Sequence, residues 1–368
     1  MKIFQTIHKY QPYIPFFESK YGISDESDLT FDQLRKLIID DGYANSYVLL
    51  PVLQYKFEEV FYTIWDYERL QLLWAKEHNI HSTDLSLIKL EQLKWFKPDV
   101  FYNLSPFCDD NFIELIKHGG INVKNFCWNG IIKPRPQSFP LYDIHLTLHR
   151  PYVEYWKKLG LNAAELQPSI PSSWVSNNEE REIDVLFYGQ YFKGMFDNRN
   201  KLIDQLIDYK LNSDKRIEIY LQYPIIKKQV LKIPKILNYK RVEFPAAKII
   251  SHTYKPVYGE ELYSKIQNSK IVVNAYTDDN VNFKSNMRVF ESIGNGALLI
   301  SERGNYPDGL IPDEDFITYD GFDELIEKIE LVLTNWNFYQ QFAQKSTEKA
   351  KILFSKEAQW EKFKEIAI

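Results

Sequence analysis

Residues 282–304 read NFKSNMRVFESIGNGALLISERG, and this stretch decides the fold. A polar start precedes the amphipathic segment 287–293, which is followed by Gly-Asn-Gly and the apolar run 297–300. This order predicts a helix whose polar start can face a ligand, a stop at the glycines, and a short buried strand. Arg288 and Glu291 stand three residues apart, so a helix places both side chains on one face.

Length and composition predict a two-domain globular protein. The chain has 368 residues, more than one ordinary domain, and its 45% hydrophobic content supports real cores. The 15% aromatic content suits a carbohydrate-binding surface and equally a general bias toward Tyr and Phe. The net charge of -5 and the pI near 5.9 argue against a nucleic-acid-binding protein, which needs a basic stripe.

The cysteines and the apolar segments indicate in which cellular compartment the protein is expected. Cys108 and Cys127 are the only cysteines, and their spacing does not resemble a metal knuckle. The first residues lack a signal-peptide pattern, and no apolar run approaches the roughly 20 residues that span a bilayer. We therefore expect a cytoplasmic protein. A peripheral contact at the inner face of the membrane, through aromatic residues 10–17, remains an alternative to a buried role for them.

Strands alternate with helices along most of the chain, which predicts parallel sheets covered on both faces. The Pro-, Ser- and Asn-rich residues 167–182 resemble a linker. We expect an N-terminal Rossmann-like acceptor domain, a linker, a C-terminal Rossmann-like donor domain, and a last helix packing back toward the first domain. Their predicted boundaries are 1–172, 173–182, 183–352 and 353–368.

The expected elements follow from hydrophobic period and from breaker residues. Strands are predicted at 1–8, 57–64, 99–104, 123–128, 143–148, 162–166, 183–188, 216–222, 270–275 and 297–300. Helices are predicted at 31–40, 46–54, 67–78, 85–96, 110–118, 152–158, 198–209, 225–237, 260–267, 287–293, 322–333, 338–353 and 354–368.

Ligands of open parallel sheets bind beyond the carboxyl ends of the strands, which directs attention to the loops there. Gly189 is predicted to end the strand 183–188 as a turn, with Lys193 and Arg199 following. Glycine and cations before a helix suit a diphosphate, because helix-start N–H groups and cations favour negative charge. The alternative is an ordinary tight turn with surface charges.

Arg288 and Glu291 carry the sharper hypothesis. A carboxylate in this position can accept hydrogen bonds from both ribose hydroxyls, as acidic residues do in dinucleotide folds. Arg288 can neutralise a phosphate or hold Glu291 in place. The alternative is a surface ion pair, which contributes only about 0.2–0.5 kcal/mol.

Histidine is the usual proton-transfer residue near neutral pH, and His8, His145 and His149 fall at or near predicted strand ends. His8 and His149 are the better placed, because His145 lies inside its strand. His8 is the candidate catalytic residue, with a structural or surface histidine as the alternative. Asp109 and Asp110 are expected to cap a helix, and no metal site is predicted, even at Asp278 and its neighbour.

Three segments resemble a known family. The segment MRVFESIGNGALLIS, preceded by LYSKIQNSKIVVNAY, resembles the C-terminal signature of GT-B glycosyltransferases. IDVLFYGQYFKGMFDNRNKLIDQL resembles the opening of that family's nucleotide domain, and KPDVFYNLSP and DIHLTLHR are similar to its N-terminal half more loosely. The branch that the chain resembles is the glycosyl transferases group 1 set that includes CgeB-like proteins.

The resemblance implies an α/β GT-B fold, with two Rossmann-like doubly wound domains facing a central cleft. It implies that Glu291 contacts the donor ribose, that the helix start from Asn282 to Arg288 approaches the diphosphate, and that the loop beginning at Tyr254 lies against the base. Many relatives carry an earlier Glu that contacts the donor sugar, and here Phe283 occupies that position. Sugar contacts are therefore expected from Asn280, Asn282 or Asn286.

We expect a glycosyltransferase that moves a sugar from a nucleoside diphosphate, UDP first, to a hydroxyl of a glycan or glycolipid acceptor in bacterial surface polysaccharide synthesis. The resemblance implies retaining transfer, and we expect no metal or other cofactor besides the nucleotide-sugar donor. His8 is expected to face the sugar. The alternatives are a catalytically silent GT-B scaffold or binding subunit, and another GT-B enzyme such as a nucleotide-sugar epimerase or a phosphorylase.

Overall fold

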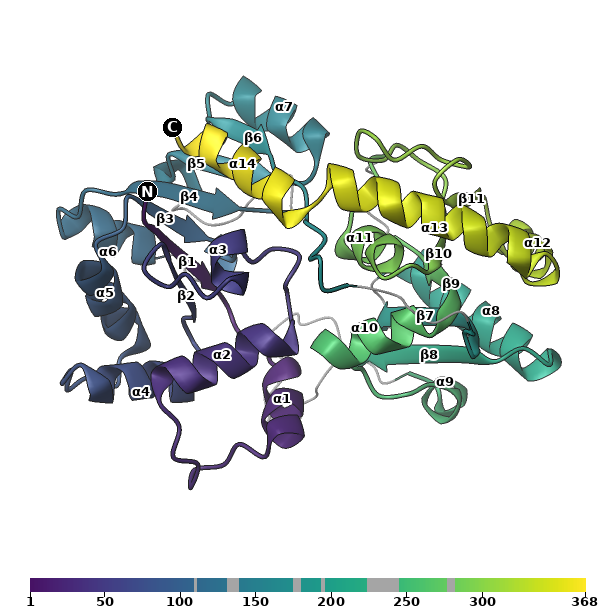
Figure 1. Ribbon diagram of the computed structural model, residues 1–368, viewed down its shortest axis with the longest axis horizontal. Helices are drawn as coiled ribbons and strands as arrows, with labels where there is room; N and C mark the ends of the chain where they lie inside the picture. The colour runs from purple at the N-terminus through teal and green to yellow at the C-terminus, as the bar shows by residue number, and fades with distance from the viewer. Residues whose placement is uncertain (109–110, 131–138, 175–179, 193–195, 224–244, 277–281) are drawn as a thin grey trace, which may run out of the picture. The chain divides into compact units, whose positions relative to one another are not determined.

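The computed structural model describes all residues except 109–110, 131–138, 175–179, 193–195, 224–244 and 277–281, which are the grey segments of Figure 1. The chain divides into two compact units. The first comprises Met1–Pro171 together with Phe354–Ile368, and the second comprises Ser172–Leu353.

The first unit is built on a six-stranded sheet in the order β2-β1-β3-β4-β5-β6, with every pair parallel. The strands are β1 Ile3–Ile7, β2 Val60–Ile64, β3 Val100–Asn103, β4 Lys124–Trp128, β5 Ile144–Thr147 and β6 Ala163–Glu165. The order reverses between β1 and β3, which is where ligands of such sheets bind.

Helices and two short 3₁₀ turns connect these strands. They are α1 Tyr13–Tyr21, α2 Phe31–Asp41, α3 Leu50–Leu53, α4 Glu68–Glu77, α5 Leu85–Phe96, η1 Pro106–Cys108, α6 Phe112–His118, η2 Phe139–Leu141 and α7 Arg150–Lys158. The strands are buried on both faces, as continuous apolar runs such as VFYTI require. Aromatic rings fill much of this core, and Phe4 stacks on Phe61 with ring centroids 4.9 Å apart.

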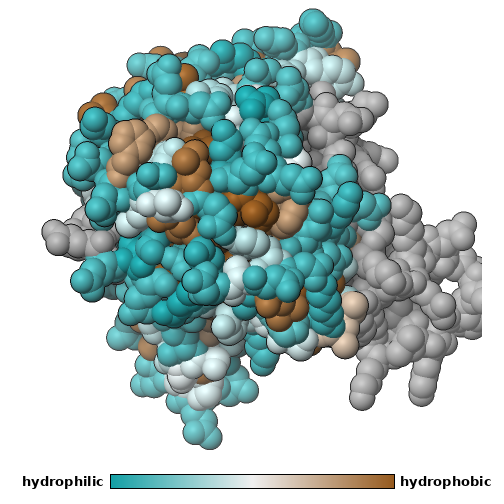
Figure 2. Space-filling view, turned by 90° about the vertical axis from the view of Figure 1, so that its right-hand side faces the viewer, coloured by the Kyte–Doolittle hydropathy of each residue, from teal (hydrophilic) through white to brown (hydrophobic). Residues whose placement is uncertain are grey.

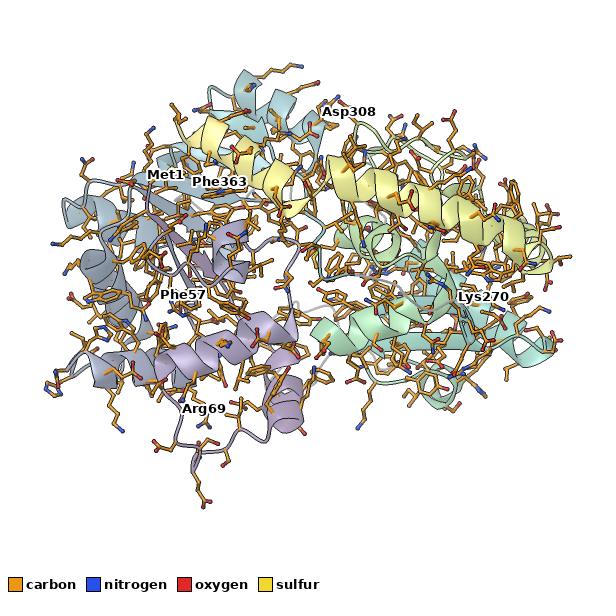
Figure 3. All side chains as sticks on the ribbon, viewed as in Figure 1. Met1, Phe57, Arg69, Lys270, Asp308 and Phe363 are labelled. Carbon is orange, nitrogen blue, oxygen red and sulfur yellow. The ribbon has the colours of Figure 1, made fainter. Side chains whose placement is uncertain are left out.

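The last helix, α14 Lys356–Ala367, packs on the first unit. Phe363 lies 5.1 Å from Tyr102 and 5.7 Å from Phe126 between ring centroids, and it is labelled in Figure 3. The buried ammonium of Lys356 donates to the backbone carbonyls of Asn45 and Val48. Apolar burial and a charge-assisted bond therefore both hold this helix in place.

The second unit has a five-stranded sheet in the order β11-β10-β9-β7-β8, again with parallel pairs. Its strands are β7 Ile183–Gln190, β8 Ile217–Gln222, β9 Ser269–Asn274, β10 Leu298–Glu302 and β11 Ile317–Tyr319. Its helices are α8 Asp197–Asn212, α9 Ala247–His252, α10 Gly259–Gln267, α11 Met287–Gly294, α12 Phe322–Thr334 and α13 Trp336–Leu353.

Alternation along β7 separates the two faces of this sheet. Val185 and Phe187 point into a core shared with α8, α9 and α12, whereas Tyr188 points to the side of α11 and hydrogen-bonds to it. The face of the molecule drawn in Figure 2 is mostly hydrophilic with scattered hydrophobic residues. The exposed apolar side chains of Leu211, Leu331 and Phe338 lie on three different helices of this unit.

The two parallel sheets confirm the predicted α/β fold class. Most predicted elements among the described residues form with bounds shifted by a few positions. The predicted helix 225–237 lies outside the described residues. Helices α1 and α9 and strand β11 were not predicted. The first lies in a Tyr- and Pro-rich stretch and ends at Gly22, whose φ of 63° is the left-handed conformation that glycine favours.

Two predictions were wrong. The helix predicted at 46–54 shrinks to Leu50–Leu53. Pro51 has no N–H that could donate to Tyr47 O in a longer helix, and the side chain of Gln5 donates to that carbonyl and accepts from Leu49 N instead. Gly189 is not a turn. Strand β7 continues to Gln190, because Gly189 and Gln190 pair in register with β8.

Candidate functional site

The candidate site of the second unit lies where the strand order of its sheet reverses, between β7 and β9. Tyr188 and Gly189 stand near the end of β7, and Asn274 is the last residue of β9. Helix α11 packs against β9 and β10 and brings its own polar side chains to this position. The location is the one that open parallel sheets use for ligands.

Helix α11 begins at the candidate site with a well-formed cap. The side chain of Asn286 accepts a hydrogen bond from Val289 N at 3.3 Å and donates one to Asn274 Oδ1 at 3.1 Å. The helix runs from Met287 to Gly294, and Gly296 at φ 82° turns the chain into β10. The predicted order of helix, glycine stop and strand is confirmed, and Asn286 is its N-cap.

The guanidinium of Arg288 is held by the ends of the two central strands. It donates to Asn274 Oδ1 at 2.6 Å and to the carbonyl of Ala275 at 3.3 Å, and it lies 5.0 Å from the Tyr188 ring centroid. A Cβ at Gly189 would approach a terminal nitrogen of this guanidinium to 3.0 Å. Glycine at position 189 therefore leaves room for the close approach of Arg288 and does not form a turn.

The carboxylate of Glu291 is buried, with 4% of the residue exposed, and accepts a hydrogen bond from the Tyr188 hydroxyl at 2.7 Å. Burial raises the pKa of Glu291, and the Tyr188 hydrogen bond and the Arg288 charge oppose that rise. Among the described residues, Arg288 and Glu291 form no ion pair with each other. The surface ion pair considered as the alternative is thus wrong, because both side chains bond to the sheet.

The other predicted donor residues lie elsewhere in the second unit. Arg199 sits in the first turns of α8, 6% exposed, with its guanidinium carbon 4.3 Å from the Phe196 ring centroid. Tyr254 is half exposed and pairs with the edge strand β8, where its ring stacks on Tyr220 at 5.1 Å. Lys193 and Asn280 lie outside the described residues, as does Asp278.

The residues just before α11 are fixed by backbone contacts. Asn282 is exposed, and its carbonyl accepts from Asn305 N at 2.8 Å. Phe283 is 8% exposed and forms a β-bridge with Asn305. An apolar side chain at position 283 therefore contributes to packing.

Sequence reasoning missed two residues that organise the cluster. Asn274, fully buried, accepts from both Arg288 and Asn286 and donates to Ser301 Oγ at 2.9 Å. Tyr188 supplies the hydroxyl that reaches Glu291. A polar residue that closes an apolar strand, as in IVVNA, was the available signal for Asn274, because buried amides need partners.

In the first unit, His8 follows β1 at the corresponding reversal of strand order. Its Nδ1 lies 2.7 Å from Asp66 Oδ2, and its backbone N–H donates to Ser105 Oγ at 3.3 Å. The other Asp66 oxygen accepts from Lys9 N at 2.6 Å. Hydrogen bonds to Asp66 and then to Cys108 raise the pKa of His8 to about 9 against the effect of burial. The imidazole is thus a cation at neutral pH.

The pKa values of the other two candidate histidines, His145 and His149, are lowered and not raised. Burial lowers the pKa of His145 and of His149 to about 4, so both are neutral at pH 7. His145 is fully buried with Nδ1 3.3 Å from Cys127 Sγ, which is a structural role. Within the described ranges, no group of three His, Cys, Asp or Glu side chains is arranged to hold a metal ion. No helix in those ranges combines the length and apolarity of a membrane span.

Comparison with known proteins bears on the class of this protein. Residues 236–363 match the family model described as Glycosyl transferase-like. No curated protein matches the sequence significantly.

Solved structures match most or all of the chain. HepE of Anabaena, crystallised with UDP and glucose, has a TM-score of 0.59 at 9% identity, over 99% of this chain and 98% of its own. A UDP-forming α,α-trehalose-phosphate synthase from Burkholderia xenovorans has a TM-score of 0.55 at 10% identity, over 100% and 99%. TarM of S. aureus has a TM-score of 0.51 at 12% identity, over 77% and 59%.

These findings confirm the expected fold. The chain has the fold of the GT-B glycosyltransferases. More particularly, it carries a glycosyl transferase-like domain at residues 236–363, which includes α11 and its Arg288–Glu291 pair.

Proposed function

We propose that the protein transfers a sugar from a UDP-sugar to a hydroxyl of a glycan or glycolipid acceptor in bacterial surface polysaccharide synthesis. The observation that carries the proposal is the cluster at the β7/β9 switch point, where a capped helix start, the Arg288 guanidinium and the Glu291 carboxylate converge. A cation and helix-start N–H groups stabilise a departing diphosphate, and a carboxylate accepts hydrogen bonds from ribose hydroxyls.

In this proposal the second unit binds the donor. Arg288 and the start of α11 at Asn282 and Asn286 face the diphosphate, and Glu291 accepts from the ribose. Gly189 makes room for Arg288, since a Cβ there would come within 3.0 Å of the guanidinium. Lys193 and Arg199 add positive charge near the diphosphate, and Tyr254, whose ring is half exposed, lies against the base.

The proposed domain roles follow the sequence boundaries: acceptor binding by 1–172, a linker at 173–182, donor binding by 183–352, and a terminal helix at 353–368. Protonated His8 faces the sugar as a hydrogen-bond donor, because Asp66 holds its Nδ1 and its pKa stands near 9. A cation that stabilises developing negative charge needs no metal ion. The proposed location is the cytoplasm, with peripheral contact at the inner face of the membrane, and transfer retains the anomeric configuration.

Two features of solved structures support UDP as the donor nucleotide. HepE of Anabaena has been crystallised with UDP and with UDP-glucose, and the Burkholderia enzyme is described as UDP-forming. The fold of this chain matches theirs at low identity, so the choice of UDP is part of the proposal.

Calorimetric titration with UDP, GDP, CDP and ADP, with and without Mg²⁺, tests this function. We expect selective binding of UDP that Glu291→Ala abolishes. The matched control is Glu327→Ala, an exposed glutamate on α12, which should leave the affinity unchanged. Absence of binding by all four nucleotides would contradict the donor site and favour the catalytically silent scaffold. Incubation with UDP-sugars and analysis of the released sugar then distinguish transfer from epimerisation.

A further inference from the structure

The proposed function assigns no role to Tyr188. This residue belongs to the donor cluster, by which we mean Tyr188, Asn274, Asn286, Arg288 and Glu291 at the β7/β9 switch point. It is the residue before Gly189 on β7, and it faces α11. Its hydroxyl donates to Glu291 Oε2 at 2.7 Å, and its ring centroid lies 5.0 Å from the guanidinium carbon of Arg288. One side chain therefore contacts both of the charged residues that α11 brings to the site.

The hydroxyl of Tyr188 determines which oxygen of Glu291 remains for a ligand. A carboxylate has two oxygens with about four acceptor directions, and Tyr188 occupies a direction on Oε2. Ser292, the residue after Glu291 on α11, donates its hydroxyl to the Arg288 carbonyl at 2.6 Å, so the Ser292 side chain has a hydrogen-bond partner within the helix. The second oxygen of Glu291 has no protein donor among the hydrogen bonds of the described residues.

We propose that Tyr188 is a positioning residue that orients the Glu291 carboxylate toward the ribose hydroxyls and thereby sets a preference for ribonucleotides over 2′-deoxyribonucleotides. This inference rests on the proposed function, in which Glu291 accepts from the ribose. A site built to pair with a hydroxyl rejects the analogue that lacks it, because a buried polar group is then left without its partner.

The same hydrogen bond favours the ionised form of Glu291. Burial raises the pKa of Glu291, and the groups that oppose this rise are the Tyr188 hydroxyl from β7 and the Arg288 guanidinium from α11. Without the hydroxyl the pKa rises further, and a protonated carboxyl loses acceptor strength toward the ribose. In a protein without the Tyr188 hydroxyl, the preference for UDP over 2′-deoxy-UDP should therefore weaken as pH falls and recover as pH rises.

Tyr188→Phe isolates the hydroxyl, because the ring that lies against Arg288 is retained. The matched control is Tyr209→Phe on α8, which likewise removes a tyrosine hydroxyl that donates to a glutamate, Glu330 of α12. Tyr209 belongs to no part of the donor cluster. Loss of a hydrogen bond to a charged group should weaken binding about tenfold where that bond matters.

The experiment measures calorimetric affinities for UDP and 2′-deoxy-UDP at pH 6 and pH 8 in four proteins: wild type, Tyr188→Phe, Tyr209→Phe and Glu291→Gln. We expect wild type and Tyr209→Phe to prefer UDP about tenfold at both pH values. Tyr188→Phe should lose most of that preference at pH 6, regain part of it at pH 8, and approach Glu291→Gln at the lower pH.

Three outcomes would overturn the inference, and they differ from failure of the proposed function. In the first, Tyr188→Phe keeps the wild-type ratio of UDP to 2′-deoxy-UDP affinity at both pH values. In the second, it weakens both ligands equally, which indicates a packing role. In the third, wild type binds UDP without any ribose preference. A wild type that binds neither nucleotide would instead refute the donor site itself, and the inference with it.

Discussion

The His8–Asp66 pair allows a prediction whose size follows from the structure. Replacing Asp66 by Asn removes the carboxylate whose oxygen lies 2.7 Å from His8 Nδ1 and whose hydrogen bond with His8 is the largest cause of the raised pKa. Asparagine can still accept from Lys9 N, as Asp66 Oδ1 does at 2.6 Å, so the backbone at position 9 keeps its partner. The variant therefore changes the charge with little change in local geometry.

The expected magnitude comes from the two pKa values. The ordinary pKa of 6.5 and the value of about 9 in the folded protein correspond to about 3.5 kcal/mol of differential interaction, at about 1.4 kcal/mol for each pH unit. The His8 side chain is 32% exposed, so solvent screening reduces this figure to about 1–2 kcal/mol. In Asp66→Asn the pKa of His8 should fall back toward its ordinary range.

The sign of the stability effect is set by the direction of the shift. The pKa of His8 is higher in the folded than in the unfolded protein, so the pair stabilises fully below about 6.5, and this stabilisation is lost as pH rises through about 9. Urea unfolding at pH 6, 7.5 and 9 should show wild type losing about 1–2 kcal/mol relative to Asp66→Asn over that range.

The direct assay is an NMR titration of ¹³C-labelled histidine, with the His8 signal assigned by its absence in His8→Gln. A wild-type His8 that titrates near pH 6.5 would refute the argument that Asp66 holds it as a cation. His149, whose pKa burial lowers to about 4, serves as the internal control and should not respond to Asp66→Asn.

Two further predictions concern Gly189 and Asn274, which both lie beside the Arg288 guanidinium. Gly189→Ala places a Cβ 3.0 Å from the Arg288 guanidinium, which must shift by a few tenths of an ångström away from Asn274. UDP affinity should therefore fall several-fold by calorimetry while the melting temperature stays near that of wild type, and unchanged affinity would argue against this contact. Asn274→Ala leaves Arg288 and Asn286 without a shared acceptor and should lower the free energy of unfolding by about 2–3 kcal/mol in urea. A loss below about 0.5 kcal/mol would mean that these groups find other partners.

Local patterns were sufficient for the elements whose signals are contained in a few neighbouring residues. Helix α5 at Leu85–Phe96 has the predicted bounds, because Asp84 caps its start and Lys97-Pro98 ends it. Helix α11 and β10 follow from the same kind of signal, the polar start and the Gly-Asn-Gly stop. The α/β class follows from their alternation with apolar strands.

The predictions that failed depended on partners distant in sequence. The residues around Tyr47 have helical periodicity, but the amide of Gln5, 42 residues earlier, binds their backbone. Gly189 has the composition of a turn, yet pairing with Leu221 of β8 extends the strand through it. In both cases a long-range hydrogen bond outweighs a local preference of about 1 kcal/mol or less.

The sequence by itself determined the helix that carries Arg288 and Glu291, the glycine stop after it, and the parallel α/β architecture. These depend on periodicity and backbone preference, which neighbouring residues decide. Only the tertiary structure decided that Tyr188 meets Glu291 across 103 positions, that Asn274 joins Arg288 to Asn286, and that Asp66 holds His8 as a cation. Strand order brings these side chains together, and burial then requires each polar group to find a partner.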